Sequence, residues 1–168
     1  VKGMAADGIP YTGFLYAGLM IAPDGKIKTL EFNCRMGDPE TQPIMARLRS
    51  DLVNALDHAI DGKLNEIELD WDRRTALGVV LAAHNYPETP RNGDVITGIP
   101  DDTESQITFH AGTKLQDGKV ITSGGRVLCV VGLADTVRGA QQKAYDAIEK
   151  IRFDGMQYRK DIGYRAIK

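Results

Sequence analysis

The sequence lacks the features that mark membrane and nucleic-acid-binding proteins. No apolar run in its 168 residues approaches the roughly 20 residues that a helix needs to cross a bilayer. Its 21 Lys and Arg residues are balanced by 23 Asp and Glu residues, and no long block carries one sign. With a net charge of −2, there is no electrostatic case for nucleic acid or an anionic membrane as a partner.

Cysteine is scarce, and the chain shows no targeting segment. Cys34 and Cys129 are isolated in apolar strand-like runs, without the paired spacing of a zinc site or a redox motif. We therefore expect two buried free thiols in a reducing cytoplasm. The amino-terminal run Val1 to Met4 has no signal-peptide architecture, and it does not resemble a natural start.

Several common catalytic patterns are also missing. The sequence contains no Ser-His-Asp spacing, no nucleophile elbow and no glycine-rich phosphate loop of the Walker or Rossmann kind. His58, His84 and His110 have no cysteine or second histidine at ligand spacing, so a metal site built on histidine is not expected.

The stretch from Leu30 to Gln42 has the densest set of side chains that could bind a ligand or take part in catalysis. As a strand, its first part places Glu31, Asn33 and Arg35 on one face and apolar side chains on the other. A carboxylate and an amide oxygen two positions apart can reach one Mg²⁺ ion, which prefers oxygen ligands and shares its shell with phosphate and water. Arg35 would then stand close to metal-bound phosphates.

The residues after this strand form a turn into a helix. We predict that the strand ends at Gly37 and that residues 38–41 lead into a helix with Pro43 in its first turn. Backbone N–H groups at such a helix start favour an anion. Taken alone, the pattern fits a half-buried edge strand with solvated charges equally well.

The first half of the chain is predicted to contain a hairpin and one long helix. A loop over 1–10 precedes strands within 11–21 and 26–36, which a turn at 22–25 joins. Apolar residues recurring every four positions predict a single helix over 43–60, of about four to five turns, with Gly62 as its left-handed cap. The polar segment after it is a candidate boundary between two modules.

The second half is predicted to be a mostly antiparallel sheet with one packed helix, which makes the fold class α+β. The helix begins with a cap at Asp135 or Thr136 and ends near Lys150. An Asp117-Gly118 turn predicts a hairpin between strands 107–111 and 119–122. The expected strands are 76–83, 94–97, 107–111, 119–122 and 126–133, with a final strand and turn at 158–163.

Several long motifs resemble the glycinamide ribonucleotide synthetases, also called phosphoribosylamine-glycine ligases. The matching runs are Tyr11 to Leu19 (YTGFLYAGL), Glu31 to Pro43 (EFNCRMGDPETQP), Ser50 to Leu52 (SDL), Phe109 to Thr113 (FHAGT), Gly124 to Leu128 (GGRVL) and Tyr158 to Gly163 (YRKDIG). They occur in the family's order and cover essentially the whole chain, so the edge-strand interpretation is no longer favoured.

The resemblance implies an ATP-grasp enzyme of purine biosynthesis that uses ATP, glycine and 5-phosphoribosylamine. In that reaction glycine is phosphorylated on its carboxylate, and the amine of phosphoribosylamine attacks the acyl phosphate. By resemblance, Glu31 and Asn33 bind Mg²⁺ or Mn²⁺. By analogy with the Glu-x-Asn-x-Arg pattern of biotin carboxylases, Arg35 steadies the γ-phosphate or the acyl phosphate. The resemblance to the ligase family also suggests that Asp38 and Glu40 orient the amine of glycine or phosphoribosylamine.

The resemblance also implies that the chain is the carboxy-terminal portion of a longer, monomeric enzyme. Residues 1–62 match the last piece of the ATP-grasp domain, 63–75 a linker, and 76–168 the small sheet domain. The amino-terminal half, which holds adenine and most of the phosphate contacts in the family, is then a required partner. We expect the isolated chain not to turn over.

Two other hypotheses stay open. The chain could be a non-catalytic binding or accessory module, although three polar residues on one strand face have no packing reason to stay together. It could also belong to another ATP-grasp ligase or to a biotin-dependent carboxylase. That alternative shares Glu-x-Asn-x-Arg but leaves the GDPETQP and FHAGT runs unexplained.

Overall fold

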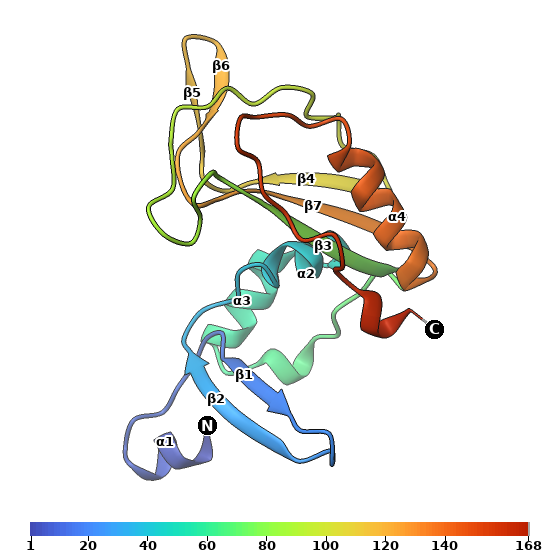
Figure 1. Ribbon diagram of the computed structural model, residues 1–168. Coiled ribbons are helices and arrows are strands. Elements are labelled where there is room, and N and C mark those ends of the chain that lie inside the picture. Colours follow the sequence, from blue (N-terminus) through green and yellow to red (C-terminus); the bar gives the residue numbers. More distant parts are fainter. Residues whose placement is uncertain (168) are drawn as a thin grey trace. The chain divides into compact units, whose positions relative to one another are not determined.

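The computed structural model describes residues 1–167, which form two compact units (Figure 1). The first unit contains residues 1–41 and 48–71. The second contains residues 42–47 and the chain from Asp72 onward. Within the described residues, no helix is both long enough and apolar enough to span a membrane.

A β-hairpin is the main element of the first unit, as predicted. Strands β1 (Tyr16–Ile21) and β2 (Ile27–Asn33) pair antiparallel, with a register shift between Gly18 and Leu19. The prediction that the second strand reaches Met36 is wrong, because the first residue of β1 already pairs with Asn33. Beyond Asn33 the chain has no strand to pair with.

The predicted single helix over 43–60 is also wrong. The chain forms α2 (Thr41–Arg47) and α3 (Leu52–Ile60), and the intervening residues make polar contacts instead of helical ones. Arg49 N donates to the Asp70 carbonyl at 3.0 Å, and Ser50 Oγ accepts from Asp70 N at 2.7 Å. These bonds give the backbone between α2 and α3 partners outside a helix. The helix is therefore interrupted here, although apolar residues recur every four positions across the interruption.

The ends of α3 follow familiar capping chemistry. The Asp51 carboxylate accepts hydrogen bonds from the amides of Val53 and Asn54, as an N-cap does. Gly62, with φ of 71°, has the left-handed conformation that its sequence position predicts. The predicted loop at the chain's start contains a short helix, α1 (Lys2–Ala6), and the 3₁₀ turn η1 (Leu64–Glu66) follows α3.

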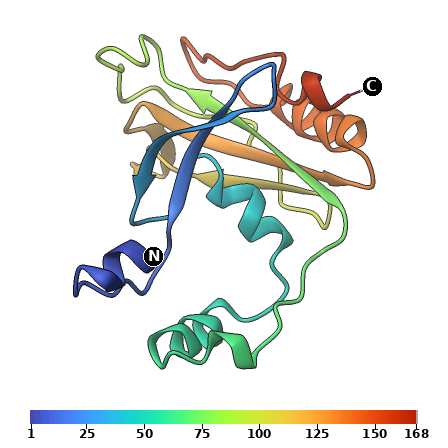
Figure 2. The ribbon, with the colours of Figure 1, turned by 90° about the horizontal axis from the view of Figure 1, so that it is seen from below.

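The second unit is built on a three-stranded antiparallel sheet. Strands β3 (Thr75–Ala82), β7 (Arg126–Ala134) and β4 (Gln106–His110) lie in the order β3-β7-β4, which Figure 2 shows with β7 in orange between its neighbours. Helix α4 (Val137–Ile148) packs on this sheet. The predicted α+β class, with antiparallel strands and a packed helix, is therefore confirmed.

The sheet is apolar on both faces because both are covered. On the α4 side, Leu81, Val127 and Ile148 are fully buried in the main core. A second cluster contains Cys129, Val131 and Leu133, against which Ala46 of α2 packs. Residues 42–47 therefore belong to the sheet's core although they precede it in the chain.

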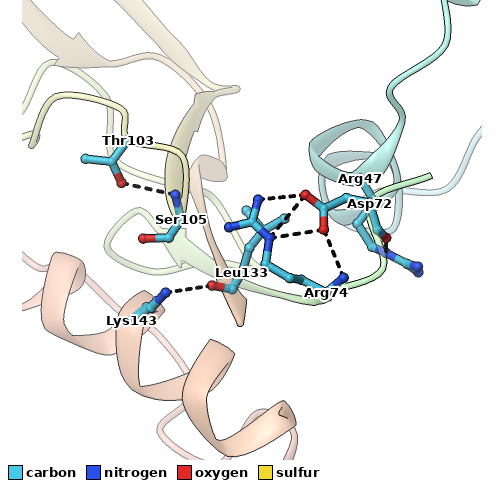
Figure 3. A network of polar contacts seen from close by, with 7 residues as sticks. All are labelled: Arg47, Asp72, Arg74, Thr103, Ser105, Leu133 and Lys143. Carbon is cyan, nitrogen blue, oxygen red and sulfur yellow. Dashed lines mark hydrogen bonds and ion pairs between the residues drawn. The ribbon is translucent and has the colours of Figure 1, made fainter. Parts of the chain in front are cut away.

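A hydrogen-bond network ties α2 to the start of β3 (Figure 3). The buried Asp72 carboxylate accepts from Arg74 N at 2.9 Å and from Arg74 Nη2 at 2.6 Å. Its backbone carbonyl accepts from Arg47 Nε at 2.9 Å, while Asp72 N donates to the Arg47 carbonyl at 2.7 Å. Figure 3 also shows Lys143 of α4 donating to the Leu133 carbonyl at 3.0 Å.

The hairpin around Asp117 and Gly118 is confirmed, but its first strand was predicted wrongly. β5 (Thr113–Gln116) pairs with β6 (Lys119–Thr122), and both turn residues have positive φ. The predicted strand at 107–111 is β4, which pairs with β7 instead. The alternation of apolar and polar residues identifies a strand at 107–111, but it does not show which strand pairs with it.

Three smaller predictions also need correction. Residues 94–97 form only isolated bridges, and residues 158–163 form no strand; the 3₁₀ turn η2 (Tyr164–Ala166) follows them. Both cysteines are free, but only Cys129 is buried, since Cys34 is exposed directly after β2.

Candidate functional site

The hairpin of the first unit gathers polar groups on one face. Residues that pair directly across an antiparallel ladder point to the same side, and here Tyr16 pairs with Asn33 and Gly18 with Glu31. A Cβ atom at Gly18 would lie 3.1 Å from Glu31 Cγ. The absence of a side chain at Gly18 therefore leaves space beside the Glu31 carboxylate.

The turn after β2 brings a second carboxylate to this face. Tyr16 OH donates to Glu40 Oε1 at 3.4 Å, although the two residues lie 24 positions apart. A side chain at the buried Gly37 would overlap both the Glu40 carboxylate and the Tyr16 ring. Thr41 closes the turn by donating both its amide, at 3.1 Å, and its hydroxyl to the Gly37 carbonyl.

The pKa of Tyr16 is raised by the charges of its neighbours. The negative charge of Glu40 is the largest cause that raises this pKa; desolvation and the charge of Glu31 add to it, while Arg35 lowers it. Two carboxylates and one guanidinium thus act on a single phenol. The raised pKa of Tyr16 is consistent with a phenol that donates its hydrogen to a neighbouring carboxylate.

The five predicted site residues occupy the end of β2 and the turn that follows. Glu31 and Asn33 lie on β2, whereas Arg35 lies beyond its end, so its predicted place on the strand face is wrong. Arg35 Nη1 donates to the Met36 carbonyl at 3.0 Å. Asp38 is exposed in the turn that also carries Glu40. The charges of Glu31, Arg35 and Glu40 all act on Tyr16, and Asn33 faces Tyr16 across the ladder.

The donor set fits part of a divalent-cation site. Asn33 Nδ2 is buried and has no hydrogen-bond partner among the described residues, so this amide group lacks an acceptor, whereas its carbonyl oxygen is the atom that could bind a cation. Within residues 1–167, no cluster of three or more His, Cys, Asp or Glu side chains could hold a metal ion. Glu31 and Asn33 therefore suit an ion that takes most of its oxygen ligands from phosphates and water, as Mg²⁺ does.

Sequence reasoning missed Tyr16 and Gly18. The hairpin register would have found both, since the residues opposite Asn33 and Glu31 share their face. The register itself was not predictable, because it depends on the tight turn at residues 22–26 and on the bulge after Gly18.

Comparison with known proteins gives matches over most of the chain. The family model described as phosphoribosylglycinamide synthetase, ATP-grasp (A) domain, matches residues 1–41. The model described as phosphoribosylglycinamide synthetase, C domain, matches residues 76–165, more than half of the chain.

Curated relatives are much longer than this chain. Proteins named phosphoribosylamine–glycine ligase are 74% identical in Ralstonia nicotianae, over all of this chain, and 60% identical in Yersinia pestis, over 99% of it. The chain spans 40% of the length of each of these relatives. A crystal structure of phosphoribosylamine–glycine ligase from Thermotoga maritima matches 96% of this chain and 40% of its own, with a TM-score of 0.82 and 41% identity.

Proposed function

Because the chain belongs to the phosphoribosylglycinamide synthetase family, we propose that it is the carboxy-terminal part of a phosphoribosylamine–glycine ligase. The proposed reaction joins glycine to 5-phosphoribosylamine through a glycyl phosphate and releases ADP and phosphate. The observation that carries this proposal is the set of charges around Tyr16, where Glu31, Arg35 and Glu40 come together on a chain of this family.

Glu31 and Asn33 are the residues proposed to hold a divalent metal ion, Mg²⁺ or Mn²⁺. When bound, the metal would neutralise charge on the phosphates of ATP. The side chain of Asn33 offers a carbonyl oxygen for the ion and an amide nitrogen for a phosphate oxygen. The buried and unpartnered Asn33 Nδ2 supports this role, since phosphate would supply the missing acceptor.

Arg35 is proposed to stabilise the transferring phosphoryl group or the acyl phosphate. Its guanidinium is permanently charged, and the recorded bond to the Met36 carbonyl uses only Nη1. The remaining N–H groups can donate to equatorial phosphate oxygens, where negative charge develops in the transition state.

Asp38 and Glu40 are proposed to orient the amine of glycine or phosphoribosylamine. Glu40 is exposed and accepts one long hydrogen bond from Tyr16, so its carboxylate retains acceptor capacity for an ammonium group. Asp38 is exposed in the same turn. Carboxylates at these positions would hold the amine without taking part in phosphoryl transfer.

The chain is proposed to need the amino-terminal part of the longer ligase, which would supply the nucleotide pocket. In this proposal residues 1–62 complete the ATP-grasp domain, residues 76–168 form the carboxy-terminal domain, and residues 63–75 are the linker between them. The complete enzyme is proposed to be cytoplasmic and monomeric. No residue of β1 or β2 is buried, and exposed apolar patches mark interaction surfaces. The exposed large apolar residues of this hairpin region are Phe14, Leu15, Leu19, Met20, Ile21, Ile27, Leu30 and Phe32.

The decisive experiment joins this chain to the amino-terminal 60% of the Ralstonia nicotianae relative, the share that this chain does not span. We expect the hybrid to release phosphate from ATP only when both glycine and phosphoribosylamine are present, and the isolated chain to release none. Glu31→Gln and Arg35→Met should each reduce the rate by roughly a hundredfold or more. Glu68→Gln, an exposed charge in the same unit, is the matched control.

Other outcomes of this experiment identify the alternatives. Phosphate release that depends on bicarbonate or biotin instead of glycine would assign the chain to a carboxylase. A folded hybrid without any nucleotide chemistry would favour a non-catalytic accessory module. Activity of the isolated chain with both substrates would overturn the proposed requirement for the amino-terminal part.

A further inference from the structure

A basic hollow lies in the second unit, in a segment to which the proposed reaction gives no role. The 159–166 loop surrounds a cavity of about 340 Å³ whose lining comes from residues 159 and 161–166. Arg159, Lys160 and Arg165 are the basic residues of this loop, and Asp161 is its one acidic residue. The loop therefore has an excess of positive charge, although the chain as a whole has a net charge of −2.

The loop is held in shape by helix α4. Tyr145 OH donates to the Arg159 carbonyl at 2.8 Å and accepts from Ile162 N at 3.2 Å. Gln141 Nε2 donates to the Ile162 carbonyl at 2.7 Å. Burial raises the pKa of Tyr145. These bonds fix the backbone on both sides of Asp161, so the hollow is a built feature of the fold.

The two arginine side chains of the loop are oriented by their neighbours. Arg159 donates to the Asp161 carboxylate from Nε at 2.9 Å and from Nη2 at 2.8 Å. Arg165 donates from Nε to Tyr164 OH at 3.0 Å, and its guanidinium carbon lies 5.5 Å from the centre of the Tyr164 ring. Within residues 1–167, the hydrogen bonds of these two side chains use neither Nη group of Arg165 nor Nη1 of Arg159, so these groups can donate to a ligand.

Arg159 and Arg165 both line the hollow, so one loop brings two like charges to the same space. The positive charge of Arg159 lowers the pKa of Arg165, against the larger effect of Tyr164, which raises it. An anion placed between two like charges relieves this repulsion. Planar guanidinium groups match phosphate oxygens in pairs, which a single lysine cannot do.

We propose that the 159–166 loop binds a phosphate monoester, and that its ligand is the 5-phosphate of phosphoribosylamine. This inference rests on the proposed function. Among the residues that line the hollow, Tyr164 is the one aromatic side chain, and Arg165 already stacks on its ring. A nucleobase would lack the stacking surface that nucleotide sites commonly offer, so a sugar phosphate fits the hollow better than ATP does.

Binding of ribose 5-phosphate to the 168-residue chain tests the site directly. In ¹H–¹⁵N NMR titrations we expect ribose 5-phosphate to shift the Nε–Hε signals of Arg159 and Arg165, while ribose does not. Arg165→Gln should weaken binding about tenfold, because a charge-assisted hydrogen bond to phosphate is lost. Arg73→Gln removes an exposed arginine elsewhere in the second unit and is the matched control, for which binding should stay within about twofold.

Several results would overturn this site. They are equal binding of ribose, stronger shifts of the same two signals by ATP, and unchanged affinity in Arg165→Gln. Arg165 is exposed, and within residues 1–167 its side-chain hydrogen bond goes to its exposed neighbour Tyr164. The variant therefore tests binding without disturbing the core, and an unchanged amide spectrum verifies that it folds.

The hybrid ligase separates this inference from the proposed function. There, Arg165→Gln should raise the KM for phosphoribosylamine about tenfold and leave the KM values for ATP and glycine unchanged. If the hybrid turns over but this KM does not change, the site is wrong and the ligase function stands. If the hybrid lacks glycine-dependent turnover while ribose 5-phosphate binds the loop, the proposed function fails instead.

Discussion

At the scale of single residues, Tyr16 and Glu40 meet because Gly37 has no side chain. Any Cβ atom at Gly37 would overlap both groups. Gly18 likewise leaves space beside Glu31. Both glycines therefore act by the volume that they leave empty, so that three charged side chains can act on one phenol.

The effect of Glu40 on Tyr16 is directly testable. In Glu40→Gln, the pKa of Tyr16 should fall toward its ordinary value, because the largest cause of its elevation is the negative charge of Glu40. Phenol titration by ¹³C NMR of labelled tyrosine checks this, with Tyr16→Phe identifying the signal. Glu68→Gln, an exposed carboxylate outside the site, should leave the pKa unchanged. An equal pKa in Glu40→Gln and the parent chain would contradict the described contact.

Asp72 is the buried charge whose loss should destabilise the second unit most clearly. Asp72→Asn leaves Arg74 without its carboxylate and weakens the acceptor for Arg74 N, so the free energy of unfolding should fall by about 2–4 kcal/mol. Urea denaturation followed by circular dichroism measures this change. Asp117→Asn, in the exposed turn between β5 and β6, should change stability by less than about 0.5 kcal/mol. Similar stabilities for the two variants would show that the Asp72 network contributes little.

At the scale of secondary-structure elements, α4 approaches β7 where the strand carries a glycine. A Cβ atom at Gly132 would overlap the Ala140 carbonyl oxygen and lie 2.8 Å from Ala144 N. The fully buried alanines on the facing side of α4 serve the same close approach. Small residues on both elements thus set the distance between helix and sheet.

Gly132→Ala tests this close packing. The added methyl group must push α4 away from the sheet, which should cost about 1–3 kcal/mol of unfolding free energy. Thermal or urea denaturation of the variant measures the cost. Lys119→Ala, at an exposed position of β6, is the control and should be nearly neutral. If Gly132→Ala were as stable as the control, the helix would have to pack less tightly on β7 than described.

At the scale of the whole molecule, the two units differ in how much they bury. Strand β7 has seven buried residues, whereas β1 and β2 have none. A two-stranded hairpin without a buried face has little independent stability in water. We therefore expect the hairpin of the first unit to be less stable than the sheet of the second.

Hydrogen exchange should show this difference within one chain. Backbone amides of β1 and β2 should exchange at least roughly a hundredfold faster than those of β7, since local opening of the hairpin exposes almost no additional apolar surface. In the hybrid ligase, protection of β1 and β2 should rise while that of β7 stays unchanged. Equal protection of both sheets in the isolated chain would contradict this view of the first unit.

Much of the fold followed from local pattern. The hairpin, the run that became β3, the capped helix after Thr136 and the left-handed Gly62 were all predicted, because each depends on neighbours within a few residues. The errors concern long-range partners. The break between α2 and α3 depends on hydrogen bonds to Asp70, about twenty residues later in the chain. Strand β4 pairs with β7, not with β6, the strand that follows the Asp117-Gly118 turn.

For the candidate site, the sequence by itself determined which chemical groups are available, since Glu31, Asn33, Arg35, Asp38 and Glu40 all stand in one short segment. Only the tertiary structure decided which groups meet. Hairpin register placed Tyr16 opposite Asn33, and the turn at residues 37–41 brought Glu40 to the same phenol. The physical reason is that residue type sets charge and donor chemistry locally, whereas distances between side chains depend on strand pairing and packing across the chain.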